Sequence, residues 1–479
     1  MSQLLLDNAI GWVHFRLLGG RSRLFWIVGM FTILAIAALM VPATVIGAPA
    51  GYLLNGFVGF ELVISILIAP TLTSNAIRRD VKERMIESHR LMPVSGPEAI
   101  VGYLIGPNAI PICLFLGSIV FGSIAAAESG VIIPRFLIAS GIVLSFATFL
   151  TIFAAFGSFG SANSGGIWLI FAVAPIFSNN PNLGHALPAA AIFGAPFMRK
   201  TVFSMQAGVD EPLAYAISEL FQLLMGILFF IGAQRRYRAP QKPGFTPLMG
   251  MATVAIWTAA SVIGIAHWDL FRWQTFGSDR VDQNLQWTVA ASIGLFIAAT
   301  PVLLCDRLRF VWNLRRRLNP DLPEKPPMPG TLVALCCATM VVLLGPLALP
   351  QQATFQNLAL VATIVLAFLF SIRYWDSLFR RMHVAGLTLA ALAATWGGPP
   401  LLVLTLEWLA VLPSSPAGIL ANPICACSTP VALYDVWGAP KNPILWGIVF
   451  QVMLAVTGAM LAYGRQLRRG RRRVHSLPR

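Results

Sequence analysis

Charged residues are scarce in this sequence: Asp, Glu, Lys and Arg together make up only 11% of its 479 residues. Hydrophobic residues reach 57%, and the mean hydropathy is +0.74. A soluble fold of this length does not hide so much apolar surface from water. The apolar runs are about 20 residues long, which is the length that a helix needs to cross a bilayer. The sequence therefore predicts a polytopic membrane protein.

Acidic residues are the scarcer of the two charged kinds, with 19 Asp and Glu against 34 Lys and Arg. In a soluble protein the resulting net charge of +15 would suggest nucleic acid as a partner. Here 28 of the 34 basic residues fall in six short segments beside apolar runs. Anionic membrane lipids are the simpler partner for basic residues in such places, so we expect no nucleic-acid binding.

Cysteine is also sparse, and four of the six cysteines lie in or beside apolar runs, where they behave as small apolar side chains. The other two, Cys425 and Cys427, are one residue apart, and a disulfide between them would close a strained ring. No histidine cluster accompanies them. The sequence therefore predicts neither a disulfide nor a metal site.

Catalytic and nucleotide-binding patterns are missing. No G-x-x-x-x-G-K-[ST] phosphate loop occurs, so we expect no cofactor in this chain. Four polar residues gather in one predicted outer loop, but Trp and Phe residues between them indicate an interfacial aromatic belt rather than a catalytic centre. These residues are His267, Asp269, Asp279 and Asp282. We expect no catalytic residue and no enzyme activity.

The long apolar runs predict an all-α fold, because they are too uniformly apolar for the alternating strands of a membrane barrel. The fifth run is short, and segment 186–198 with its two prolines is expected to be a re-entrant or interfacial helix. Twelve spans are expected: 24–47, 52–76, 99–127, 131–157, 165–177, 213–233, 246–266, 285–304, 330–348, 355–372, 384–411 and 444–464.

The distribution of Lys and Arg predicts the orientation. The six basic segments all fall on one side if the N-terminus is cytoplasmic, so both termini are expected inside a plasma, or inner, membrane. Before the first span, Leu5, Ile10, Val13 and Leu17 recur at helical spacing. This spacing predicts an amphipathic helix on the inner membrane surface.

The two halves of the chain resemble each other. Shifting the first half by 229 residues brings its spans onto those of the second half and aligns Phe221-Gln222 with Phe450-Gln451. We therefore expect two parallel six-helix repeats, a pseudo-dimer within one chain. The first unit would be 1–238, and the second, more divergent unit would be 239–479 with a basic C-terminal tail.

The loop between the second and third spans is unusually rich in charge. Ile77, Val81 and Met85 recur every four residues, so 77–90 is predicted to form a short amphipathic helix with an Asp80–Arg84 pair. The helix would stop before Pro93. Ser95 and Glu98 then have the spacing of a capping box, which predicts the start of the third span.

This loop resembles the segment after the second helix of type-2 ABC transporter permeases, in which the pattern I-x-x-E-x-x-x-G-T-x-E is followed by T-P-L-S and E-I-x-x-G-K. Matching positions are Ile77, Asp80, Glu87, Pro93, Ser95, Glu98 and Gly102. Three positions depart from the pattern: Arg84 replaces its glycine, Met85 its threonine and Tyr103 its lysine. The similarity covers about forty residues of the chain.

The resemblance implies a membrane-spanning subunit of an ATP-driven exporter. Helix 77–90 would be a coupling helix that docks on a separate ATPase subunit, and that partner would bind ATP and Mg²⁺. The docking residues implied by the resemblance are Asp80, Glu83, Arg84, Glu87 and Pro93. In the second half the corresponding loop, 306–327, carries five arginines that face only Asp306 within its helical part, which suits lipid headgroups as well as a protein.

Two alternatives remain at this stage. The loop helix could simply be held by anionic lipid, and twelve spans in two parallel repeats also describe gradient-driven carriers of the major facilitator type. The loop lacks the G-x-x-x-D-R-x-x-R-R pattern of those carriers. Carboxylates within spans, Glu61, Glu219 and Glu407, are either helix-packing partners or the polar lining of an export path.

Overall fold

The computed structural model describes most of the predicted spans. The described residues are 8–40, 52–128, 130, 133–159, 212–239, 244–266, 283–318, 328–350, 353–379, 384–409, 424–438 and 442–474. Within these ranges all regular structure is helical, which confirms the all-α prediction. Eleven of the helices are long and apolar enough to cross a membrane, and each corresponds to a predicted span. The predicted fifth span, 165–177, and segment 186–198 lie outside the described residues.

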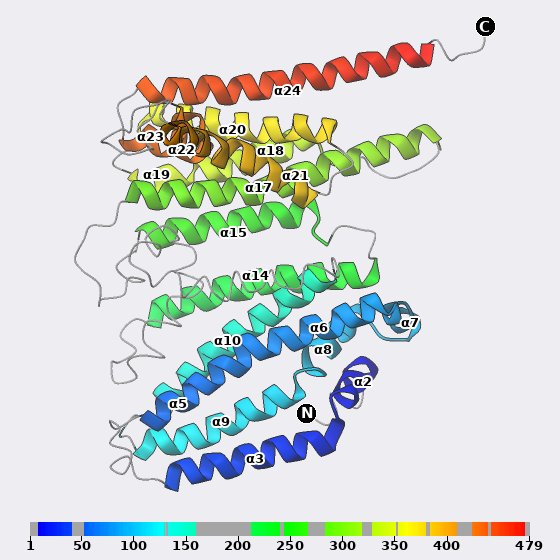
Figure 1. Ribbon diagram of the computed structural model, residues 1–479, viewed down its shortest axis with the longest axis vertical. Helices are drawn as coiled ribbons and strands as arrows, with labels where there is room; N and C mark the ends of the chain where they lie inside the picture. Colours follow the sequence, from blue (N-terminus) through cyan, green and yellow to red (C-terminus); the bar gives the residue numbers. More distant parts are fainter. Residues whose placement is uncertain are drawn as a thin grey trace. The chain divides into compact units, whose positions relative to one another are not determined.

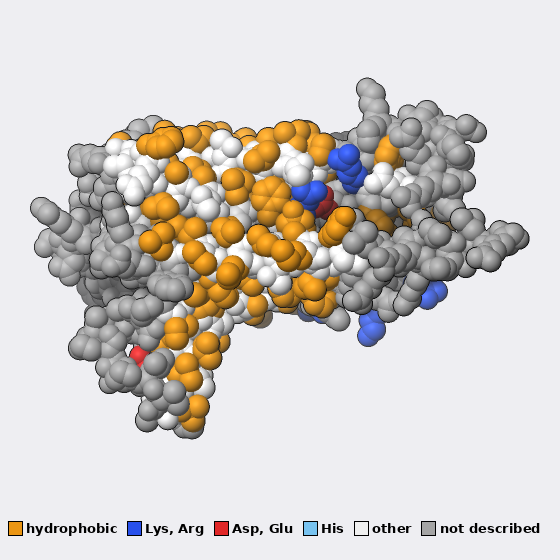
Figure 2. Space-filling model, turned by 90° about the horizontal axis from the view of Figure 1, so that it is seen from above, with side chains coloured by type: hydrophobic (Ala, Val, Ile, Leu, Met, Phe, Trp, Pro, Cys, Tyr) orange, Lys and Arg blue, Asp and Glu red, His pale blue; other side chains and the backbone are white. Residues whose placement is uncertain are grey.

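The chain is thus a multi-pass membrane protein. On the face seen in Figure 2, hydrophobic side chains cover most of the described surface, and the Lys and Arg side chains lie in the right-hand half of the view. Helix α3 (Gly20–Met40) illustrates the composition: Ala35 is its one buried residue, whereas Phe25 and Trp26 are more than two-thirds exposed. Such a helix is stable where lipid covers it, because its backbone groups bond within the helix.

Contacts within the chain divide it into two units, the first holding the described residues up to Gly244 and the second those from Phe245 onward. In the first unit (Figure 1) α2, α7 and α8 lie together at one end of the longer helices. Besides α3, the described elements of this unit are α2 (Ala9–Leu17), α5 (Tyr52–Leu62), π-helix η1 (Val63–Ile68), α6 (Ala69–Lys82), α7 (Met85–Leu91), α8 (Gly96–Ile105), α9 (Ala109–Glu128), α10 (Ile133–Ser158) and α14 (Pro212–Arg238).

The prediction of one helix over 77–90 was wrong. Helix α6 continues from the membrane span to Lys82, and Arg84 then adopts a left-handed conformation with φ of 59° before α7 begins at Met85. A left-handed residue cannot continue a right-handed helix. The chain therefore turns sharply at Arg84, and α7 is a separate short helix.

The predicted third span is also divided. Helix α8 ends at Ile105, and α9 begins at Ala109 after the sequence Gly106-Pro107-Asn108. The capping box at the start of α8 is confirmed: Ser95 accepts a hydrogen bond from the backbone of Glu98 at 3.4 Å, and the Glu98 carboxylate accepts one from the backbone of Ser95 at 2.8 Å. Only α9 is long and apolar enough to span.

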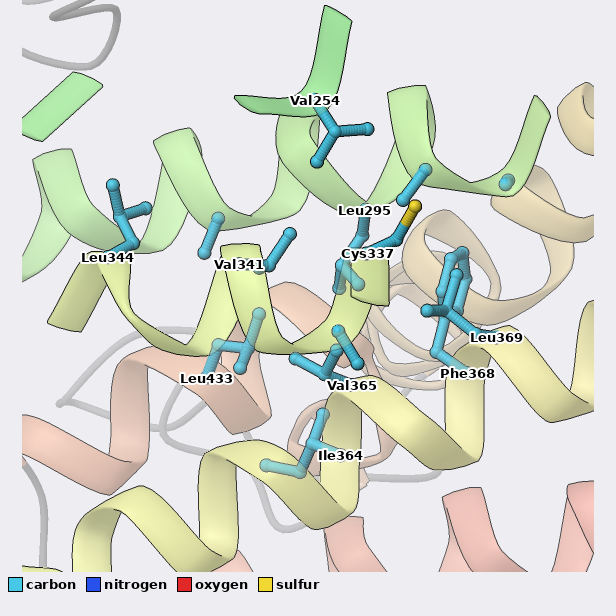
Figure 3. Close-up of a cluster of buried hydrophobic side chains, with 14 of the residues drawn as sticks. Val254, Leu295, Cys337, Val341, Leu344, Ile364, Val365, Phe368, Leu369 and Leu433 are labelled. Carbon is cyan, nitrogen blue, oxygen red and sulfur yellow. The ribbon is translucent and has the colours of Figure 1, made fainter. Parts of the chain in front are cut away.

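The second unit packs around a core of aliphatic and aromatic side chains. In Figure 3, Val254, Leu295, Val341 and Phe368 converge with their neighbours from four long helices. Its elements are α15 (Pro247–Ala266), α17 (Gln283–Leu318), α18 (Gly330–Val342), α19 (Leu344–Ala348), α20 (Phe355–Leu378), α21 (Val384–Leu392), π-helix η4 (Ala393–Gly397), α22 (Gly398–Trp408), 3₁₀-helix η6 (Cys425–Cys427), α23 (Thr429–Gly438) and α24 (Asn442–Val474).

Helix order in the two units follows the predicted offset closely. The last helices of the two units, α14 and α24, begin at Pro212 and Asn442, which are 230 residues apart. The helices that open them, α3 and α15, begin at Gly20 and Pro247, which are 227 residues apart. The similar spacing at both ends is consistent with a duplicated helical unit.

We expect residues at opposite ends of the first unit to face opposite sides of the membrane. Ser88 is exposed on α7, and Glu128 is exposed at the far end of α9, a helix of 20 residues that begins at Ala109. A cysteine introduced at Ser88 should react with an impermeant thiol reagent from the cytoplasm, and one at Glu128 only from outside. Reaction of both from the same side would contradict the predicted topology.

Candidate functional site

A buried polar cluster joins the four helices at one end of the first unit. Asp80, in the last turn of α6, is fully buried, and its Oδ2 accepts a hydrogen bond from the Tyr103 hydroxyl of α8 at 2.7 Å. The Nε2 atom of His14, on α2, lies 3.0 Å from the same oxygen. The Nδ1 atom of His89, on α7, lies 3.0 Å from the Tyr103 hydroxyl. We call Asp80, His14, His89 and Tyr103 the Asp80 cluster.

The hydrogen positions in this cluster follow from its chemistry. A carboxylate only accepts hydrogen bonds, so His14 carries a hydrogen on Nε2. The Tyr103 hydroxyl gives its hydrogen to Asp80 and therefore accepts one from His89, which requires a hydrogen on Nδ1 of His89. Burial, followed by the negative charge of Asp80, raises the pKa of Tyr103, so its hydroxyl remains a donor.

The charge state of His89 depends on opposing effects. Burial lowers the pKa of His89, the Asp80 carboxylate opposes this, and a positive charge on His14 lowers it further. The net direction is downward, so the neutral ring is favoured. His89 is only 3% exposed and acts in the cluster as a neutral donor.

Close backbone packing fixes α2, and with it His14, against α8. Gly102 and Gly106 face α2, and a Cβ at Gly106 would lie 2.5 Å from the carbonyl oxygen of Gly11. Asn8 caps α2 by accepting from the Gly11 backbone at 2.9 Å and donates to the Glu98 carbonyl at 2.6 Å. The predicted amphipathic N-terminal helix is thus also a packing partner of α8, with Ile10, Gly11, His14 and Phe15 buried.

Two arginines connect α14 with its neighbouring helices at the end of the first unit that holds the Asp80 cluster. The Arg90 Nε group donates to the carbonyl of Tyr237, and the Arg90 guanidinium lies 5.8 Å from the centre of the Tyr237 ring. Arg236 donates to the Phe156 carbonyl at 2.7 Å and lies over the Phe156 ring. These arginines, which the charge distribution assigned to the inner side, also hold helices together.

Among the predicted docking residues, Asp80 requires a correction. Asp80 was expected to be exposed and to pair with Arg84, but it is fully buried and bonds to His14 and Tyr103. The turn at Arg84 explains the difference, because it ends the helical spacing that would bring the two side chains together. A partner cannot contact Asp80 directly.

The other predicted docking residues are exposed and surround the turn between α6 and α8. They are Glu83, Arg84, Glu87 and Pro93. Two apolar side chains that the sequence reasoning missed extend this surface: Leu91 is 89% exposed and Met92 36%. We call the exposed residues Glu83, Arg84, Glu87, Leu91, Met92 and Pro93 the α7 surface. An exposed leucine and methionine beside charged groups suits either a protein contact or lipid.

The three candidate path carboxylates lie in different settings. Glu61 on α5 is fully buried beside serines, whereas Glu219 on α14 is half-buried and accepts a hydrogen bond from Ser145 of α10. Glu407 is half-buried at the end of α22 in the second unit. The structure therefore places two of the three in one unit, each beside a serine of α10, with Ser140 next to Glu61.

The second unit has a different arrangement at the residues that match the loop after span two. Helix α17 runs without interruption to Leu318, as the spacing of its apolar residues predicted. Its Asp306 pairs with Arg373 of α20, and its Arg307 pairs with Asp376 of α20 at 2.5 Å. The segment 306–327 has only Asp306 as an acidic residue in its helical part, and α20 adds Asp376 as a partner for Arg307.

Metal and disulfide chemistry finds no support in the described parts of the chain. None of the six cysteines, which all lie in the described ranges, forms a disulfide. The described residues contain no group of three His, Cys, Asp or Glu side chains able to hold a metal ion. The outer-loop residues considered for catalysis, His267, Asp269, Asp279 and Asp282, lie outside the described residues.

Comparison of the chain with models of protein families, with curated proteins and with solved structures gives no match.

Removal of the Tyr103 hydroxyl should weaken the cluster. Tyr103→Phe leaves the Asp80 oxygen and the His89 nitrogen without one partner each, and we expect a loss of about 1.5 kcal/mol in unfolding free energy. Asp80→Ala should cost about 3 kcal/mol, because it leaves several buried donors unpaired. The matched control is Tyr463→Phe, since Tyr463 is 64% exposed. Thermal unfolding in detergent measures all three, and equal stability of Tyr103→Phe and the control would show that the cluster contributes nothing.

Acidification should loosen the same cluster through His89. Because the pKa of His89 is lower in the folded chain than the ordinary 6.5, the unfolded chain takes up a proton that the folded chain resists. Stability from His89 is therefore complete above about pH 6.5 and is lost as the pH falls below it. His89→Gln keeps a donor for Tyr103 but does not titrate. We expect the melting temperature of the wild type to fall more steeply below pH 6.5 than that of His89→Gln, and parallel curves would refute the assignment.

Proposed function

We propose that the chain is the membrane-spanning subunit of an ATP-driven exporter of the type-2 ABC class, and that a separate ATPase subunit docks on the α7 surface. The observation that carries this proposal is the turn at Arg84. This residue occupies the position of the glycine in the type-2 permease pattern, and its φ of 59° lies in the region that favours glycine. The backbone conformation at Arg84 is thus the one that glycine favours, at the position where the pattern has glycine, and this supports the resemblance beyond residue identity.

The Asp80–Tyr103 hydrogen bond gives further support. The pattern has glutamate at the position of Asp80 and lysine at that of Tyr103, two residues of opposite charge. In this chain the two positions lie 2.7 Å apart and bond to each other. The departure at Tyr103 therefore keeps a donor opposite a buried carboxylate, and it preserves the contact that the pattern implies between α6 and α8.

Such a corner can transmit movement. Helix α6 is continuous with the membrane helix that begins at Tyr52, so its last turn is rigidly connected to the span. Asp80 joins this turn to α8 and α2, and Arg90 joins α7 to α14. A push on the exposed α7 surface would therefore move several helices of the first unit together. ATP and Mg²⁺ would bind to the partner subunit, and this chain would itself hydrolyse nothing.

Orientation and location form part of the same proposal. Both termini and the α7 surface would face the cytoplasm of an inner membrane, and the remaining basic side chains would contact anionic lipid. The docking surface is assigned to the first unit, because α17 in the second unit continues straight through the corresponding position up to Leu318. The two units would then couple unequally to ATPase subunits.

A gradient-driven carrier is the competing proposal. Multiple helices in two similar units suit that class as well. A carrier needs no docking partner, and lipid would then cover the exposed Leu91 and Met92. Collapse of substrate transport by a protonophore at constant ATP would favour the carrier.

We expect charge reversal and side-chain truncation on the α7 surface to weaken binding of the ATPase subunit to this chain. The double variant Glu87→Lys and Leu91→Ala changes two exposed residues and should reduce copurification of the ATPase by about tenfold or more, because a central interface anchor typically contributes 2 kcal/mol or more. The measurement is mass-spectrometric quantification of ATPase subunits that copurify from native membranes.

Glu128→Lys is the matched control, since it makes the same charge change at an exposed position at the other end of the first unit. The control should retain the ATPase, and both variants should keep the wild-type melting temperature. Full ATPase recovery with the α7 variant would show that docking occurs elsewhere or not at all.

A further inference from the structure

Glu61 is a buried carboxyl group within a membrane-spanning helix. It lies eight residues after Leu53, the first residue of this span, and so about 12 Å along the helix from its outer end. Its side chain is 0% exposed. Neither of its carboxyl oxygens makes a hydrogen bond of standard geometry, although two serine hydroxyls lie within its reach. An ionised carboxylate in such a place is costly, because neither water nor protein compensates its charge.

Two serine side chains lie beside this carboxyl group, Ser118 on α9 and Ser140 on α10. Ser118 is fully buried and donates its hydrogen to the Phe57 carbonyl at 3.3 Å, so only its lone pairs remain available. The Ser140 hydroxyl is 1% exposed and makes no hydrogen bond of standard geometry, with Glu61 as the acceptor beside it. The site thus contains three hydrogen-bond acceptors, the two carboxyl oxygens of Glu61 and the hydroxyl oxygen of Ser118. Only one hydrogen, that of the Ser140 hydroxyl, is available to bond with them.

One additional proton completes this set. A neutral Glu61 can donate its O–H to Ser118 and accept the hydrogen of Ser140 on its other oxygen. Every polar atom of the three side chains then has a partner after small rotations. An ionised Glu61 would leave one oxygen without a donor and a negative charge without compensation.

Among the side chains that the structure describes, no basic group forms an ion pair with Glu61. Helix α9 carries Cys113 and, at its far end, the exposed Glu128. Helix α10 has one ionisable residue, Arg135, five positions before Ser140, and between Glu61 and Arg78 the chain has none. A proton is therefore the simplest charge that can neutralise the carboxylate.

The helix changes its winding directly after this residue. Residues Val63–Ile68 form the π-helix η1, which packs against both α9 and α10. Single π-turns inside α-helices occur often at functional sites, since they redirect side chains and backbone groups. The serines and the altered helix thus meet at the same point of the span as the unpartnered carboxyl.

We propose that Glu61, Ser118 and Ser140 form a proton-binding site within the membrane-spanning part of the first unit. Glu61 holds the proton, Ser118 accepts the hydrogen bond from the acid, and Ser140 donates to its carbonyl oxygen. This proposal does not rest on an ATPase partner and holds for the isolated chain.

Infrared spectroscopy of the purified chain tests the site. A protonated carboxyl group gives a C=O band separate from those of amides and carboxylates, and the band shifts when the proton exchanges for deuterium. We expect the wild type to show this band at neutral pH, Glu61→Gln to lose it, and Ser140→Ala to keep it at a changed frequency. Glu61→Gln should fold as the wild type does, because the amide has the same shape and is neutral.

Glu98→Gln is the matched control. Hydrogen bonds from the Ser95 backbone and side chain lower the pKa of the exposed Glu98, so this residue stays ionised and its replacement should leave the band unchanged. The proposal is overturned if the wild type lacks the band or if Glu61→Gln retains it. Loss of the wild-type band on addition of Na⁺ at constant pH would also overturn it, since the site would then take a metal cation instead of a proton.

Discussion

The arrangement of the first unit at its α7 end depends on one buried carboxylate. Asp80 lies at the last turn of a membrane helix and is held by Tyr103 and His14, with His89 bonded to Tyr103 behind them. A carboxylate buried without donors would be strongly destabilising, so the surrounding helices must take positions that supply them. This requirement fixes α2 and α8 relative to α6 and leaves the turn at Arg84 exposed. The proposed docking surface is thus built on a buried charge.

In the second unit, buried or partly buried carboxylates are compensated by arginines instead of by a tyrosine and histidines. Its helices α17 and α20 are joined by two ion pairs, Asp306 with Arg373 and Arg307 with Asp376. Opposite charges on two long helices compensate each other directly, so no additional short helix is needed to supply donors. At the residues that correspond to the turn at Arg84, the described chain continues as helix α17 to Leu318. Duplicated helical units can in this way keep their span order while only one of them forms an exposed corner.

Hydrophobic run lengths predicted the all-α class and twelve spans, eleven of which the described residues contain, because the bilayer imposes a minimum length on each span. The capping box at Ser95 was predictable for the same kind of reason, since it depends on local spacing. Burial of Asp80 was not predictable, because it results from contacts with His14 and Tyr103, which lie 66 and 23 residues away in the chain. The break at Arg84 could have been anticipated from the glycine of the permease pattern, whereas the 89% exposure of Leu91, at the end of α7, depends on how α7 lies against its neighbours and not on local spacing.

The central claim is that the α7 surface contacts an ATPase in the membrane. A photoreactive amino acid in place of Leu91, which is 89% exposed, tests it most directly in native membranes. Irradiation should join this position to an ATPase subunit, and the same amino acid at Glu128 should not give that product. Crosslinks from position 91 to lipid alone, with the ATPase absent from all products, would contradict the account.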